Sequence, residues 1–176
     1  MNKAGIKVGI IDFAVYENAN EYIGVAKVGM PETTSKSFTV NGAGIAGDVV
    51  LPVVGHTDAM SVTFEFTDDP EAAAKLSEQR THDITLMAAH EEFDEVEGRI
   101  KVKQHKHHLR VIPIKSGGGS IAPASPQGTS VECACIYRED WIDGKRTLLI
   151  DKINNRYIDG SGKDILADVR KALGKN

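Results

Sequence analysis

Cysteine is scarce in this sequence, where only Cys133 and Cys135 occur among 176 residues. Two positions apart on a strand, their side chains would share a face but lie roughly 6.5–7 Å apart, too far for easy bridging. A structural zinc site usually needs four ligands, so two cysteines alone give a weak zinc signal. The sequence therefore argues against a disulfide and favours buried free thiols over a redox or metal-binding pair.

Long apolar runs are also missing. No segment approaches the roughly 20 consecutive apolar residues that a membrane-spanning helix needs. The N-terminal stretch MNKAGIKVGIIDFAVYENAN lacks a long apolar region followed by a small-residue cleavage site. We therefore expect no membrane contact and folding in the cytoplasm, most economically as one domain over residues 1–176.

Catalytic motifs are absent as well. The sequence contains no G-x-S-x-G elbow, no HExxH and no P-loop. Gly42, Gly44 and Gly47 spell G-x-G-x-x-G, but they do not join a strand to an amphipathic helix as a dinucleotide-binding turn requires. We therefore expect neither an enzyme nor a bound cofactor.

Acidic and basic residues are present but unevenly distributed about a net charge of −4. Eleven acids and two bases lie between residues 65 and 97, whereas residues 98–131 hold six bases and no acid. The negative net charge argues against general polyanion binding. The absence of aromatic residues from 99–115 disfavours recognition of single-stranded nucleic acid by stacking.

The two charge blocks fall on consecutive predicted strands, 82–94 and 99–114, joined by a turn at 95–98. If the paired residue numbers sum to about 193, Asp94 faces Arg99 and the acids of one strand face the bases of the other near the hairpin tip. The residues proposed for cross-strand or intersubunit charge contacts are Glu92, Asp94, Arg99, Lys101 and Lys103.

Hydrophobic periodicity predicts a mostly β fold with two helices. A short helix is predicted over 70–80, with proline at its first position. A C-terminal amphipathic helix of about three turns is predicted from a capping box at Ser161 and Asp164 to a stop at Gly174. A flexible loop rich in Gly, Ser and Pro is predicted over 116–130. Strands are predicted at 60–66, 82–94, 99–114, 131–138 and 146–154.

Residues 31–58 show no regular pattern, although they include the apolar run VVLPVVG. A long irregular stretch inside a compact domain is usually functional or disordered, and its valines argue against disorder. An apolar loop that a monomer cannot cover suggests a partner surface. The alternative is a strand-rich connection that packs in the core.

Three histidines, His105, His107 and His108, lie among the bases of residues 101–111. On a strand His105 and His107 share a face and could supply half of a metal site, although the basic segment contains no carboxylate. A discrete metal- or ligand-binding β-barrel that uses His105 and His107 is therefore the alternative function. The other interpretation is that these histidines are surface residues without a ligand.

Several short motifs follow one another along the chain in a characteristic order. They are NGAGIAG at 41–47, DAMS at 58–61, Tyr137, DGK at 143–145, IDKINN at 150–155, Asp159-Gly160 and VRKALG at 169–174. Together they resemble the major tail tube proteins of contractile-tailed bacteriophages, and they are similar to the tubes of R-type bacteriocins.

The resemblance implies a tail-tube-like β-sandwich or small barrel with a short flanking helix and a C-terminal helix. Six subunits are expected to close into a ring, and rings to stack into the hollow inner tube of a contractile tail or a bacteriocin. Sheath, baseplate and tape-measure proteins are the implied partners. DNA is expected to pass through the lumen of a phage tube without specific binding. The implied location is a virion tail or bacteriocin particle, assembled in the cytoplasm of the bacterial host.

By the same resemblance, residues 41–57 form a long assembly loop. Its apolar side chains would gain burial only in the assembly, and its glycines would let backbones approach closely. The residues expected at the assembly interface are Asn41, Gly42, Gly44, Ile45, Gly47, Val49, Val50, Leu51, Val53 and Val54.

Overall fold

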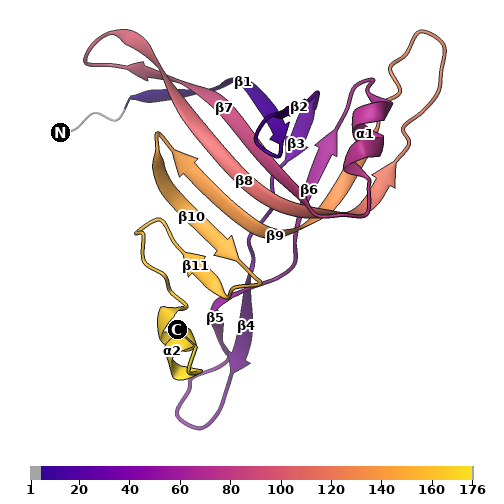
Figure 1. Ribbon diagram of the computed structural model, residues 1–176. Helices are drawn as coiled ribbons and strands as arrows, with labels where there is room; N and C mark the ends of the chain where they lie inside the picture. Colours follow the sequence, from indigo (N-terminus) through magenta and orange to yellow (C-terminus); the bar gives the residue numbers. More distant parts are fainter. Residues whose placement is uncertain (1–4, 176) are drawn as a thin grey trace.

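The computed structural model describes residues 5–175, which form eleven β-strands and two short helices (Figure 1). The prediction of a mostly β fold is confirmed. The strands are β1 (Ile6–Glu17), β2 (Glu21–Ile23), β3 (Lys27–Gly29), β4 (Ser35–Val40), β5 (Val49–Thr57), β6 (Met60–Glu65), β7 (His82–Asp94), β8 (Arg99–Gly117), β9 (Ser130–Ile142), β10 (Lys145–Asp151) and β11 (Arg156–Ile158). The helices are α1 (Pro70–Leu76) and α2 (Ala167–Ala172).

Nine of the described strands form one bent sheet in the order β11-β10-β9-β8-β7-β1-β2, with β6 added to β9 and β3 added to β6. β9 is the branch point of this sheet. One edge of β9 pairs with β8, while its other edge pairs first with β6 and then with β10. Because β2 and β11 end the path without pairing to each other, the described sheet is open and does not close into the barrel that was one expectation.

The hydrophobic core lies where the bent sheet folds over itself beside α1. The buried side chains come from β1, β2, β6, β7, β8, β9, β10, the helix α1 and Phe66 just after β6, and they include Val15, Val62, Phe64, Leu76, Ile84, Leu109, Val111 and Val131. Cys133 and Cys135 are buried free thiols in this cluster, as predicted. Burial raises the pKa of Cys133 to about 12 and that of Cys135 to about 11.

The predicted β7–β8 register is confirmed. Asp94 pairs with Arg99 and Glu92 with Lys101, and the same register continues along both strands to His82. A one-residue slip would turn every core side chain of β7 to the opposite face, so the hydrophobic pattern fixes this register. The charge blocks noted in the sequence are therefore neighbouring strands of one hairpin.

The ends of several elements differ from the predicted ones. Asp69 does cap α1, accepting a hydrogen bond from the backbone N–H of Ala72 at 3.0 Å, but the helix ends at Leu76. The loop predicted over 116–130 is shorter, since β8 continues to Gly117 and β9 begins at Ser130. Propensity alone does not show where sheet pairing extends a strand into a glycine-rich segment.

The C-terminal region is less helical than predicted. The strand predicted over 146–154 ends at Asp151, and α2 has only six residues. Ser161 does not cap a helix; its hydroxyl bonds Asp159 at 2.5 Å. The stop at Gly174 is confirmed, because this residue has φ +68° and Lys175 donates its backbone N–H to the carbonyl of Arg170 at 2.9 Å, a Schellman closure.

The prediction of a long loop over residues 41–57 is also wrong about the secondary structure. Residues 49–57 belong to β5, which pairs with β4 in a separate two-stranded sheet. Only residues 41–48 form a connecting tip. The alternative interpretation, a strand-rich connection that packs in the core, is therefore correct about the strands. It is wrong about core burial, since both strands are largely exposed.

Candidate assembly surface

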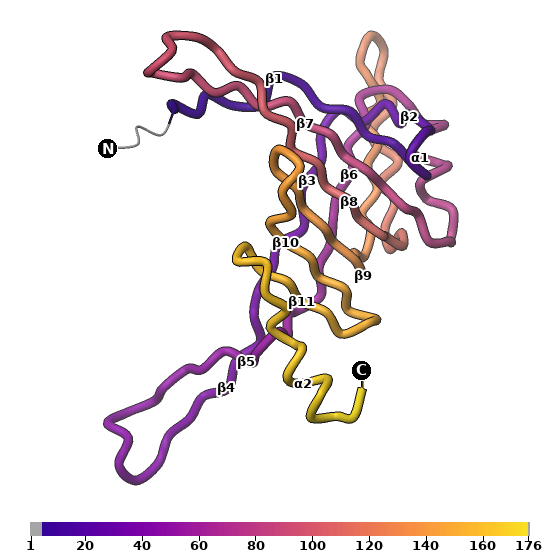
Figure 2. Tube along the Cα trace, turned by 60° about the vertical axis from the view of Figure 1, so that its left-hand side comes forward, coloured from indigo at the N-terminus to yellow at the C-terminus, as the bar shows by residue number. Residues whose placement is uncertain are grey.

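The β4–β5 hairpin stands away from the rest of the chain. Its two strands pair with each other and, among the described residues, with no strand of the main sheet. Figure 2 shows the hairpin extending from the body of the protein, with its tip at one extreme of the molecule. An isolated two-stranded hairpin is marginally stable in water, so additional contacts are expected to stabilise it.

The hairpin exposes apolar side chains on both strands. Phe38 is 62% exposed and Val50 63% exposed, and Leu51 and Val54 are also exposed. Of the residues expected at the assembly interface, only Val53 is half-buried. The exposed members are Asn41, Gly42, Gly44, Ile45 and Gly47 in the tip and Val49, Val50, Leu51 and Val54 on β5.

The root of the hairpin is tied to the end of β10. Lys152 donates its ammonium group to the backbone carbonyls of Thr57 and Asp58. Asp58 donates its backbone N–H to the carbonyl of Thr34 at 2.9 Å, which closes the base of the hairpin. These contacts hold the root while leaving the apolar strands exposed.

A second exposed apolar surface lies on the arm formed by the start of β1 and the tip of the β7–β8 hairpin. Ile6, Phe93 and Ile100 stand side by side on three adjacent strands. They are exposed, and Val102 next to them is exposed as well. Single exposed apolar residues are ordinary, but a cross-strand row of this kind marks an interaction surface.

The opposite face of the arm is charged. Lys101 bonds Asp94 at 2.6 Å and Glu97 at 3.2 Å, and Lys103 bonds Glu92 at 2.5 Å. All members of the predicted charge set therefore lie together, but the side chains pair diagonally rather than directly across the strands. The hydrogen bond from Lys101, with backbone N–H groups of Glu97 and Val96, lowers the pKa of Asp94 to about 2.

Comparison with known proteins assigns the family. Residues 8–174 match the family described as phage tail tube protein FII. The chain belongs to this family. A search of curated protein sequences finds no match.

Solved structures resemble this tail tube protein in fold. A sheath/tube terminator of an extracellular contractile injection system (PVC), in the extended state, has TM-score 0.56 at 12% identity, over 80% of this chain and 99% of that one. The sheath–tube complex of the PVC system has TM-score 0.56 at 12% identity, over 80% and 93% of the two chains. A tube-terminating cap of the anti-feeding prophage has TM-score 0.53 at 13% identity, over 73% of this chain and 87% of that one. At these identities the likeness shows the fold alone.

The histidines of this tail tube protein are held by local contacts. His107 bonds Asp140 at 2.8 Å, and Arg138 bonds the same carboxylate at 2.8 Å. The ring of His105 stacks on that of His90 with centroids 3.6 Å apart. Residues 5–175 contain no group of three His, Cys, Asp or Glu side chains placed to hold a metal ion, so the metal-binding alternative lacks a ligand set there. Neither described helix is long and apolar enough to cross a membrane.

Sequence analysis missed the apolar face of the arm. Ile6, Val8 and Ile10 alternate with Lys7 and Gly9, which is the pattern of a strand with one apolar face. This signal at the N-terminus was available in the sequence. The row that β1 forms with Phe93 and Ile100 was not, because it depends on pairing between Ile6 and Phe93, which lie far apart in the sequence.

Proposed function

We propose that this tail tube protein assembles into rings of six subunits, which stack into the hollow inner tube of a contractile phage tail or a phage-tail-like bacteriocin. The observation that carries the proposal is the projecting β4–β5 hairpin, whose apolar side chains are exposed in the single chain. Burying this surface against a second copy of the chain would contribute about 25 cal/mol per Å² of apolar area.

Sheet edges supply the contacts within a ring. β2 pairs with Val15–Glu17 of β1, and in the described part of the chain no strand covers the same edge of β1 before Val15. An uncovered edge is a template for pairing with another chain. A closed ring of identical subunits uses each such edge once and leaves none exposed, which favours a ring over an open chain.

The hairpin and the apolar face of the arm supply the contacts between rings. These two surfaces lie far apart in the molecule. The arm includes the N-terminal end of β1, and the tip of the β4–β5 hairpin lies at the opposite extreme (Figure 2). Two apolar surfaces at different ends suit head-to-tail association, because each copy offers one surface to the copy before it and the other to the copy after it.

The further partners that we propose for the tube are other components of contractile particles. The similar solved structures include a sheath–tube complex and a baseplate of the anti-feeding prophage. By analogy, we propose that the outer wall of the tube contacts sheath subunits and that its ends contact baseplate and tape-measure proteins. Assembly takes place in the cytoplasm of the bacterial host.

Negative-stain microscopy combined with light scattering tests the proposal. Purified protein is examined over a range of concentrations, and the expected result is rings with sixfold symmetry together with tubes that lengthen as concentration rises. Protein that remains monomeric at every concentration, with neither rings nor tubes, would contradict it.

A further inference from the structure

The β4–β5 hairpin bends where the C-terminal segment touches it. Ser35 pairs with Thr57 and Ser37 with Pro52, so residues 53–56 of β5 bulge opposite the single residue Lys36. Within this bulge Gly55 has φ +66°, a left-handed conformation that side-chain-bearing residues rarely adopt. The bulge changes the direction of the strand and so sets where the hairpin tip points.

The side chain of Leu166 fills the space beside Gly55. A Cβ atom added to Gly55 would lie 2.5 Å from Cγ of Leu166 and 2.9 Å from its Cδ1. Leu166 is only 3% exposed, yet it does not belong to the main hydrophobic cluster. The contact with Gly55 therefore links this buried side chain of the C-terminal segment to the hairpin.

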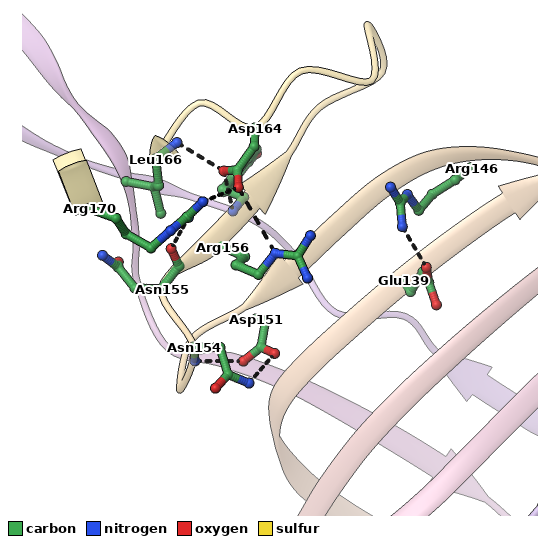
Figure 3. A network of polar contacts seen from close by, with 10 residues as sticks. Glu139, Arg146, Asp151, Asn154, Asn155, Arg156, Asp164, Leu166 and Arg170 are labelled. Atoms are coloured by element: carbon green, nitrogen blue, oxygen red, sulfur yellow. Dashed lines mark hydrogen bonds and ion pairs between the residues drawn. The ribbon is translucent and has the colours of Figure 1, made fainter. Parts of the chain in front are cut away.

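Asp164 holds Leu166 in this position. Its carboxylate accepts the backbone N–H of Leu166 at 3.1 Å and the guanidinium of Arg170 at 2.7 Å, and Arg156 approaches it at 4.0 Å (Figure 3). Arg170 in turn donates to the backbone carbonyl of Asn155 at 2.8 Å. These bonds tie residues 164–170 to the turn before β11, which belongs to the main sheet.

We propose that the C-terminal segment 164–173 is a brace that fixes the direction of the β4–β5 hairpin, with Leu166 as its positioning residue. The segment is anchored to the main sheet through Asp164 and Arg170, and it reaches the hairpin at the bulge. Without the brace, the hairpin keeps its strand pairing but rotates about Gly55 and samples several directions. The consequence for assembly rests on the proposed tube function, whereas the positioning itself does not.

A distance measurement in the unassembled protein tests the positioning. Spin labels are attached at Ala43→Cys in the hairpin tip and Lys145→Cys on the body, while the buried Cys133 and Cys135 remain unlabelled. The reference protein is expected to give one narrow distance distribution, and Leu166→Ala a distribution at least twice as broad. Leu173→Ala is the matched control, because Leu173 lies on the same segment but is 62% exposed; its distribution stays narrow.

Two results would overturn the brace. One is a distribution for Leu166→Ala as narrow as that of the reference. The other is global unfolding of this variant, because the proposal places Leu166 outside the core. Gly55→Ala provides an independent variant, in which the added methyl group pushes against Leu166 and is expected to shift the mean distance.

Tube formation provides the second readout. Leu166→Ala is expected to raise the protein concentration needed for tubes about tenfold, since fewer copies hold the hairpin in the docking direction. If the reference protein forms no tubes, the proposed function fails while the distance measurement still decides the brace. If Leu166→Ala broadens the distances but forms tubes as readily as the reference, the brace does not control assembly.

Discussion

Glu17 and His82 form a hydrogen bond of 2.8 Å between Oε1 and Nδ1, and both side chains are fully buried. Nε2 of His82 lies 3.0 Å from the backbone carbonyl of Glu78, and Arg80 bonds the Glu17 carboxylate at 2.7 Å. Both ring nitrogens of His82 therefore face oxygen atoms of Glu17 and Glu78. These contacts of Glu17, Arg80 and His82 join β1 to the segment between α1 and β7.

Glu17→Gln tests this cluster. The amide lacks the negative charge that faces the guanidinium of Arg80 and the buried ring of His82, and loss of a hydrogen bond to a charged group costs about 1.5–3 kcal/mol. Glu21→Gln, which alters an exposed carboxylate on β2, is expected to cost under about 0.5 kcal/mol. Urea unfolding at neutral pH measures both, and equal losses in the two variants would contradict the assignment.

The same cluster is expected to make the protein sensitive to acid. Burial raises the pKa of Glu17, but hydrogen bonds from Arg80 and His82 outweigh it and leave the pKa below its ordinary value. A lowered carboxyl pKa contributes stability that is fully present above the unfolded-state pKa and is lost as the pH falls through the folded-state pKa. Urea unfolding from pH 7 to pH 3 is expected to show this loss, and to show less of it in Glu17→Gln.

A charge exchange tests the ion pairs of the arm. Glu92→Lys places a cation beside Lys103 and is expected to destabilise the hairpin by about 0.2–1 kcal/mol. Adding Lys103→Glu should restore the stability, because the side chains of these two residues bond each other. Adding Lys101→Glu instead should restore less, although Lys101 is the backbone partner of Glu92. Thermal unfolding of the single and double variants distinguishes the diagonal from the direct pairing.

Acidic substitutions in the hairpin test its role as a docking surface. Val50→Asp and Leu51→Asp are each expected to prevent tube formation, because a carboxylate would be buried without a partner. The melting temperature of the unassembled chain should change by less than about 2 °C, since both positions are exposed. Ile121→Asp, in the loop between β8 and β9, is the matched exposed control and should leave tubes intact. Tubes formed by all three variants would show that the hairpin does not dock.

The two thiols offer a measure of native packing. Burial raises the pKa values of Cys133 and Cys135, and only the thiolate reacts rapidly with a disulfide reagent. We expect modification at pH 8 to be at least about 100-fold slower in the folded protein than in urea. Rapid modification of either thiol in the folded state would show that β9 opens locally.

Sequence reasoning succeeded where two patterns supported each other. The β7–β8 register was predictable because the hydrophobic alternation and the charge blocks both require Asp94 near Arg99. Buried free thiols at 133 and 135 followed from their spacing on a strand, which is too wide for a disulfide, and from the lack of further cysteines to complete a zinc site. These features depend on residues that are close in the sequence, so a single chain contains enough information to place them.

The hairpin and the brace were harder to predict. Residues 49–52 pair with a strand that faces solvent, so they lack the apolar–polar alternation that reveals a half-buried strand. The C-terminal segment has helical periodicity, yet Asp164 uses its carboxylate to bond Leu166, Tyr157 and Arg170 rather than to start a helix at Ser161. Tertiary contacts of this kind override local propensity.

The branch at β9 has a consequence for the order of folding during synthesis. β6 is made early, but the strand that it pairs with, residues 130–135, is about 70 residues later in the chain. Contacts of such long sequence separation form slowly, since the intervening chain must first lose entropy. The apolar side chains of β6 therefore wait for β9 to leave the ribosome, and translation sets the earliest time at which this core can form.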